Sequence, residues 1–104
     1  MIQVRKKRGG PANAVHPGEM LREEFLAPLG IKPAQLARAL GISVPRVNDL
    51  VLERRAMTAD TALRLSKYFG NSAQFWMNLQ SEYELDLAAA KAKGIQRITP
   101  REAA

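Results

Sequence analysis

The sequence predicts an all-α fold of five helices that contains a helix-turn-helix and ends in a long C-terminal helix. Apolar residues recur at spacings of three and four along most of residues 16–94, which is the period of helices with one buried face. Capping residues and glycines divide this pattern into five segments. Two of these segments are short, and only Gly41 and Ile42 separate them before the capping residue Ser43. This spacing is typical of a helix-turn-helix.

The length and composition of the chain fit one small domain with tails. The chain has 104 residues, of which 46% are hydrophobic and 25% are charged. We expect a flexible basic arm over residues 1–15, the helix-turn-helix domain over residues 16–94 and a C-terminal tail over residues 95–104. The absence of cysteine excludes disulfides and cysteine zinc sites. No apolar run approaches the roughly 20 residues that cross a bilayer, and no signal peptide is visible, so we expect a cytoplasmic protein.

The net charge of +6 favours a polyanionic partner, because cationic side chains release counterions from a phosphate backbone. A ribosomal or merely soluble basic protein would have a similar charge. Four of the six net charges also lie in the expected arm, at Arg5, Lys6, Lys7 and Arg8. The local placement of cations therefore says more about function than their total number.

The first helix is expected to begin after His16, with Pro17 in its first turn, and to end at Pro28 and Gly30. Three residues spaced by four form its expected inner stripe: Leu21, Phe25 and Leu29.

The helix-turn-helix occupies the next two segments. The second helix is expected to begin at Lys32 or Pro33 and to end at Gly41, whose freedom to adopt a positive φ suits the turn. Ser43 caps the third helix, and Ile42 is expected to plug the crossing of the two helices. Five residues form the expected inner faces: Leu36, Ala37, Leu40, Val47 and Leu50.

The last two helices follow a loop over residues 52–57. Thr58 caps a fourth helix that ends at Gly70, and Ser72 caps a fifth that is expected to run to Lys93 before Gly94. This last helix is longer than a core of this size needs. We expect its later turns, which carry Leu85, Leu87 and Ala88 to Ala90, to pack on a second copy of the chain.

The second helix of a helix-turn-helix enters the major groove of DNA, so its outward residues are the candidate base readers. Arg46 suits guanine, Asn48 adenine or a phosphate, and Val44 a thymine methyl group, whereas Asp49 suits cytosine or repels wrong sites. Lys32, Gln35, Arg54 and Arg55 are expected to meet phosphates. The alternative for all of them is an ordinary solvated surface. The complete predicted DNA-binding set is Lys32, Gln35, Ser43, Val44, Pro45, Arg46, Asn48, Asp49, Arg54 and Arg55.

No catalytic or metal site is visible in the sequence. Glu19, Glu23 and Glu24 have no nucleophile or base to act with, and the single histidine, His16, stands before a proline at a helix start. Such a histidine is more often a cap or a packed ring than a base or a ligand. We therefore expect neither enzymatic activity nor a cofactor.

The chain resembles the HigA/VapI-type antitoxins, which belong to the lambda-repressor-like (XRE-type) helix-turn-helix group. The resemblance covers roughly residues 16–100. It implies a dimeric repressor that binds the promoter of its own operon. It also implies a protein partner, a HigB-type toxin similar to RelE-like mRNA-cleaving ribonucleases. The segments that carry it are HPGE (16–19), LREEFL (21–26), PLG (28–30), LA (36–37), LGI (40–42), TADTALRL (58–65), FWMNLQ (75–80) and YEL (83–85).

Two features depart from the family pattern. The family usually has a glycine before the basic pair that follows the recognition helix, but this chain has Glu53 before Arg54 and Arg55. Without glycine a positive φ is less accessible, so we expect the loop to bend differently, with an anion near the phosphate track. The basic arm before His16 is the second departure, and contacts with the minor groove, with a toxin or with neither remain open.

Two alternatives to an antitoxin follow from the sequence. A stand-alone transcriptional regulator would lack a neighbouring toxin gene. A protein-interaction module that no longer binds DNA would account for Glu53 and for the small net charge outside the arm.

Overall fold

The computed structural model describes residues 14–102, which form five helical rods and no strand. This confirms the predicted all-α fold of five helices. The expected basic arm lies outside the described residues, except for Ala14 and Val15. The last two residues of the expected tail also lie outside them.

The first rod is continuous but not uniform. It consists of α1 (Pro17–Met20), a π-helical turn (Leu21–Leu26) and α2 (Ala27–Leu29). Gly30 ends the rod with a φ of 66°, and Pro28 lies inside its last turn, contrary to the expectation that proline would help to end it. A regular α-helix would press the proline ring against the carbonyl group four residues earlier. The wider π-helical turn before it relieves that contact.

The π-helical turn also changes which residues face the core. Leu21 and Phe25 are buried as expected, but Leu29 is 61% exposed. Within the turn the N–H of Ala27 donates to the carbonyl of Arg22, five residues back, which shifts the helical register by one residue. Leu26 is therefore buried in place of Leu29.

The predicted helix-turn-helix is formed by α3 (Pro33–Leu40) and α4 (Val44–Val51). Gly41 makes the turn with a φ of 73°, and Ile42 packs half-buried against the core. The Ser43 hydroxyl accepts a hydrogen bond from the Arg46 backbone N–H at 3.3 Å, which caps α4. The expected boundaries of this motif are thus confirmed.

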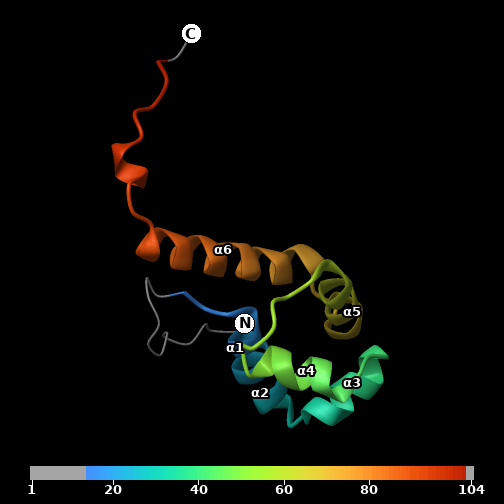
Figure 1. Ribbon diagram of the computed structural model, residues 1–104. Helices are drawn as coiled ribbons and strands as arrows, with labels where there is room; N and C mark the ends of the chain where they lie inside the picture. The colour runs from blue at the N-terminus through green and yellow to red at the C-terminus, as the bar shows by residue number, and fades with distance from the viewer. Residues whose placement is uncertain (1–13, 103–104) are drawn as a thin grey trace.

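The chain continues into α5 (Ala59–Phe69) and the long α6 (Ala73–Lys91), which lie side by side at one end (Figure 1). The expectation that α6 would reach Lys93 was wrong, because Ala92 is already extended. The last turn of a helix frays readily, because its final carbonyl groups have no partner within the helix. Gly94, with a φ of 87°, then precedes a 3₁₀ turn (Ile95–Arg97).

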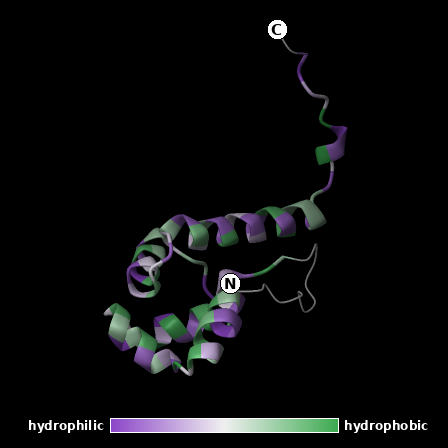
Figure 2. Ribbon diagram, turned by 180° about the vertical axis from the view of Figure 1, so that it is seen from behind, coloured by the Kyte–Doolittle hydropathy of each residue, from purple (hydrophilic) through white to green (hydrophobic). Residues whose placement is uncertain are grey.

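The five rods share one core. Trp76 of α6 is completely buried, and its ring lies 5.0 Å from that of Phe25. The second half of α6 and the tail leave this core and project away from it (Figure 1). Figure 2 shows hydrophobic and hydrophilic residues alternating along this projecting part. The buried core residues are Met20, Leu21, Phe25, Leu26, Leu36, Ala37, Leu40, Val47, Leu50, Val51, Met57, Ala62, Leu65 and Trp76.

A close contact between α1 and α4 fixes the position of α4. A Cβ atom at Gly18 would lie 1.8 Å from the carbonyl oxygen of Leu50, so only glycine fits there. The N–H of Gly18 donates to Nδ1 of His16 at 2.8 Å, and the rings of His16 and Tyr83 pack in a T-shape with their centroids 4.8 Å apart. The start of the first rod thereby ties α4 to α6.

Within residues 14–102, no helix is both long enough and apolar enough to cross a membrane.

Candidate DNA-binding surface

The start of α4 is the most open part of the predicted recognition helix. Ser43, Val44 and Pro45 are exposed, and Val44 keeps 40% of its surface accessible. Asn48 and Asp49, one turn later, are half-buried. Pro45 lacks an N–H, but it stands in the first turn, where that group would have no helical partner. The first turn of α4 therefore offers an apolar contact surface followed by a polar one.

Arg46 does not point outward as expected. Its Nη2 atom donates to Oδ2 of Asp60 at 2.6 Å and to Oγ1 of Thr61 at 2.8 Å, both on α5. Only 27% of its side chain is exposed. In this structure Nη2 of the guanidinium group therefore connects α4 to α5.

Asp49, Arg54 and Arg55 come together at the end of α4. Nη2 of Arg54 lies 3.1 Å from one oxygen of Asp49, and Nη2 of Arg55 lies 4.0 Å from the other. The two arginine side chains remain 64% and 47% exposed, so each can exchange this contact for a phosphate. Asp49 thus holds both cations near the C-terminal end of α4.

Lys32 and Gln35 lie together at the start of α3. The side-chain oxygen of Gln35 accepts a hydrogen bond from the Lys32 backbone N–H at 2.8 Å, which closes the N-terminus of the helix. Both side chains are exposed. The amide nitrogen of the Gln35 side chain and the ammonium group of Lys32 are donors, as a phosphate contact requires.

The expectation that the loop at Glu53 would bend differently from a loop with glycine was wrong. Glu53 adopts the left-handed conformation with a φ of 63°, so the loop bends as it would with glycine. Its carboxylate lies 3.2 Å from Nη2 of Arg22, which faces it from the first rod. Nη1 of Arg22 also donates to the carbonyl of Val51 at the end of α4. The Glu53 anion is therefore compensated within the protein.

Sequence reasoning missed Asp60 and Arg64. The Nε atom of Arg64 donates to Asp60 at 2.9 Å, and its Nη1 atom donates to the carbonyl of Leu40 at 2.8 Å. Hydrogen bonds from Arg64 and Arg46 hold the pKa of Asp60 below its ordinary value. The only sequence signal was the i,i+4 spacing of Asp60 and Arg64, since Arg46 lies 14 residues away from Asp60.

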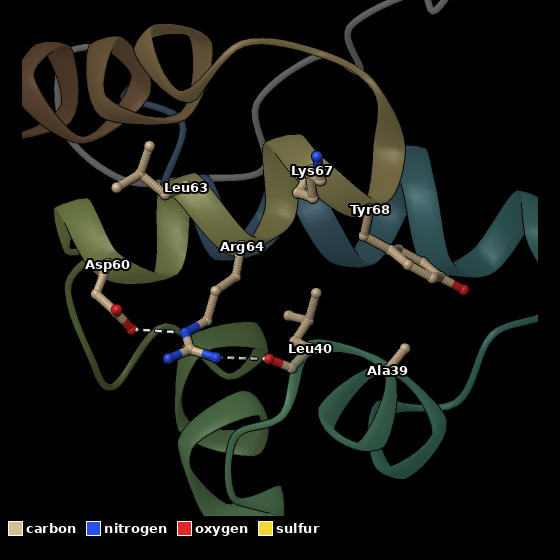
Figure 3. Close-up of a pocket in the computed structure, with 7 residues that line it drawn as sticks. All are labelled: Ala39, Leu40, Asp60, Leu63, Arg64, Lys67 and Tyr68. Atoms are coloured by element: carbon tan, nitrogen blue, oxygen red, sulfur yellow. Dashed lines mark hydrogen bonds and ion pairs between the residues drawn. The ribbon is translucent and has the colours of Figure 1, made fainter.

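Asp60 and Arg64 also border a shallow groove between α3 and α5 (Figure 3). The groove encloses about 540 Å³, and its walls combine apolar and charged side chains. The residues that line it are Ala39, Leu40, Asp60, Leu63, Arg64, Lys67 and Tyr68.

His16 is a structural residue in this arrangement. Burial lowers the pKa of its imidazole, and Arg22 lowers it further, while Glu53 opposes the change. A neutral ring is also what allows Nδ1 to accept the hydrogen bond from Gly18. Residues 14–102 contain no cluster of side chains that could hold a metal ion.

Residues 21–76, which span α3, α4 and α5, match the helix-turn-helix family. The chain belongs to the helix-turn-helix family. This family membership and the relatives described next confirm the resemblance that the sequence motifs indicated.

Three relatives are similar over most of their length. Virulence-associated protein I of Dichelobacter nodosus is 51% identical over 84% of this chain and 81% of its own. The Pseudomonas aeruginosa protein PA4674, solved in complex with its 18-base-pair operator DNA, is 55% identical, with a TM-score of 0.81 over 84% of this chain and 96% of its own. The Pseudomonas aeruginosa antitoxin HigA, solved with the higBA promoter, is 57% identical, with a TM-score of 0.78 over 84% and 97%.

Proposed function

We propose that this protein is a dimeric repressor that binds double-stranded operator DNA and, as an antitoxin, neutralises a HigB-type mRNA-cleaving toxin. The observation that carries the proposal is the exposed first turn of α4, with Arg54 and Arg55 oriented beyond its last turn by Asp49. This arrangement pairs a groove-reading element with cations for the flanking phosphates. In this proposal the protein acts on DNA in the cytoplasm, and DNA binding requires no catalytic group or cofactor.

The relatives support the same function. Two proteins of more than half identity were solved with operator or promoter DNA, and one of them is named an antitoxin. The pairing of Glu53 with Arg22 also weakens one of the two observations that favoured an interaction module without DNA binding, the other being the small net charge outside the arm.

We assign direct DNA contacts to nine of the ten predicted residues and exclude Arg46, whose guanidinium is bound within the protein. Ser43, Val44, Pro45, Asn48 and Asp49 face the groove in this proposal, whereas Lys32, Gln35, Arg54 and Arg55 face phosphates. Residues 16–94 form the DNA-binding domain, with residues 1–15 as an arm and residues 95–104 as a tail.

The dimer is proposed to form through the projecting part of α6. Leu85 there is 65% exposed, and Leu87 keeps part of its surface accessible. A second copy would cover these side chains and place two copies of α4 one helical turn of DNA apart.

The experiment is fluorescence anisotropy with the DNA immediately upstream of the gene and with a scrambled duplex, across a series of salt concentrations. We expect tight binding to the upstream duplex only. Lys32, Arg54 and Arg55 of two protomers make six phosphate contacts, so log K should fall by about 5 per unit of log salt. Replacing Arg54 and Arg55 by glutamine should lower this slope by about 3 to 4 in the dimer. Equal and weak binding to both duplexes would refute the repressor function.

The antitoxin function is tested separately with the product of the adjacent gene. We expect that product to stop translation in a cell-free extract by cleaving mRNA, and this protein to restore translation when added in equal amount. If the adjacent gene product neither binds this protein nor cleaves mRNA, the antitoxin function is refuted and the protein is a stand-alone repressor.

A further inference from the structure

One carboxylate connects the three helices that surround the recognition turn. Asp60, in the first turn of α5, accepts hydrogen bonds from Arg46 of α4 at 2.6 Å and from Arg64 of α5 at 2.9 Å. Arg64 also donates to the carbonyl of Leu40, the last residue of α3, at 2.8 Å. Figure 3 shows this chain of bonds from Asp60 through Arg64 to Leu40. The end of α3, the start of α4 and the start of α5 are thus held through Asp60.

The surroundings make this connection specific in geometry. The same nitrogen of Arg46 also donates to the hydroxyl of Thr61, which is only 4% exposed, at 2.8 Å. Nη1 of Arg64 lies 3.5 Å from the Cβ position of Gly41, so the guanidinium packs directly against the turn between α3 and α4. Two planar guanidinium groups on one carboxylate restrict the angle between α4 and its neighbours.

We propose that Asp60 is a positioning residue that sets the angle of α4 for DNA recognition, and that Arg46 acts through Asp60 and not by reading a base. The proposal rests on the DNA binding proposed above. An exposed carboxylate beside a DNA-binding surface repels phosphates, so by charge alone Asp60 weakens binding. Its two arginine partners give it a structural role that outweighs this repulsion.

The alternative role has the opposite sign. If Asp60 only stored Arg46 until a guanine displaced it, Asp60 would compete with the DNA. Removing the carboxylate would then free Arg46 and strengthen operator binding. Because the two roles predict changes in opposite directions, one substitution distinguishes them.

The first test measures the affinity of the Asp60→Asn variant of the full chain for the upstream duplex and for the scrambled duplex. We expect operator affinity to fall by about fivefold or more, the lower end of what one lost base contact costs. Affinity for the scrambled duplex should stay equal or rise slightly, because one anion is gone. Glu102→Gln is the matched control, since Glu102 is exposed in the tail, outside the proposed DNA and dimer surfaces, and forms no ion pair among residues 14–102. Unchanged or stronger operator binding by Asp60→Asn would overturn the proposal.

A second test uses Arg46→Met on a panel of operators that each carry one altered base pair. A positioning role predicts that affinity falls by a similar factor for every operator in the panel. Loss of discrimination at a single base pair would identify Arg46 as a base reader and overturn the proposal. The double variant with Asp60→Asn should bind no more weakly than Arg46→Met alone, because both changes break the same connection.

Thermal unfolding followed by circular dichroism shows whether each variant is folded. The melting temperature should change by only a few degrees, because ion pairs as exposed as these contribute little stability. If Asp60→Asn alone fails to fold, the Arg46→Met panel decides. If the unaltered protein does not distinguish the two duplexes, the proposed repressor function fails, and this inference fails with it.

Discussion

The contact between Gly18 and Leu50 makes the Gly18→Ala substitution the sharpest test of how the recognition helix is held. The new Cβ atom would lie 1.8 Å from the Leu50 carbonyl oxygen and 2.9 Å from its carbonyl carbon. Real Cβ atoms essentially never approach closer than 3.0 Å, so α1 and α4 would have to separate by about 1.2 Å, the difference between 3.0 and 1.8 Å. Both contacted atoms belong to the backbone, so no side chain can rotate away to make room.

The expected loss of stability follows from three contributions. Overpacking of this kind costs about 1–3 kcal/mol. The Leu50 carbonyl also accepts the N–H of Glu53 at 3.0 Å, and disturbing that bond costs about 1 kcal/mol more. Alanine in a helix regains about 0.5–1 kcal/mol relative to glycine. The free energy of unfolding should therefore fall by about 1–3.5 kcal/mol, a large part of the roughly 5–15 kcal/mol typical of a domain.

Urea unfolding measured by the fluorescence of Trp76 provides the assay, because this completely buried residue is the only tryptophan in the chain. All variants are compared at one protein concentration, since the apparent stability of a dimer depends on it. Gly70→Ala is the control: Gly70 has a φ of 81°, and nothing lies within 4 Å of its Cβ position. It should lose only about 1 kcal/mol from backbone strain and keep its operator affinity. A Gly18→Ala variant as stable as the unaltered protein would refute the proposed close packing of α1 on α4.

Two further predictions concern the residues around this contact. Because the pKa of His16 is lowered in the folded protein, the unfolded chain binds more protons just below pH 6.5. The contribution of neutral His16 to the free energy of unfolding should therefore be fully present above pH 6.5 and be lost as the pH falls through the folded pKa. Urea unfolding between pH 5 and 8 measures this, with a slope of at most about 1.4 kcal/mol per pH unit, and a flat profile would contradict it. Glu53→Ala should be about 1 kcal/mol less stable than Glu53→Gly, because both lose the bond to Arg22 but only alanine retains the strain of a positive φ. Equal stability of these two variants in urea would show that the loop can relax.

Local signals explain why most of the fold could be predicted from the sequence. The hydroxyls of Ser43, Thr58 and Ser72 each accept a backbone N–H three residues later, at 3.3, 3.3 and 3.0 Å. Gly41 and Gly70 then end α3 and α5 in the left-handed conformation. Each of these signals acts within four residues, so the sequence alone locates it. The π-helical turn has no such signal, and the burial of Leu29 was therefore predicted wrongly.

The roles of the arginines could not be predicted, because their partners are distant in the sequence. Arg46 pairs with a residue 14 positions away, and Arg22 with one 31 positions away. A pattern of helical spacing identifies Arg46 as lying near the protein surface, but it cannot show that α5 brings a carboxylate to meet it. The base-reading role predicted for Arg46 depended on the absence of such a partner.

The distribution of positive charge also changes what salt dependence can reveal about this protein. Arg22, Arg46 and Arg64 are paired with carboxylates on other turns or other helices, so they add little to the field that DNA meets. Lys32, Arg38, Arg54 and Arg55 are the exposed cations within and beside the helix-turn-helix, while four further cations lie at residues 5–8. Cations of either group would release counterions on meeting phosphates, so a steep salt slope alone does not identify the surface that binds. Lys32, Arg54 and Arg55 lie beside the α3–α4 motif that is proposed to enter the groove, so we expect their contribution to depend on the sequence of the duplex.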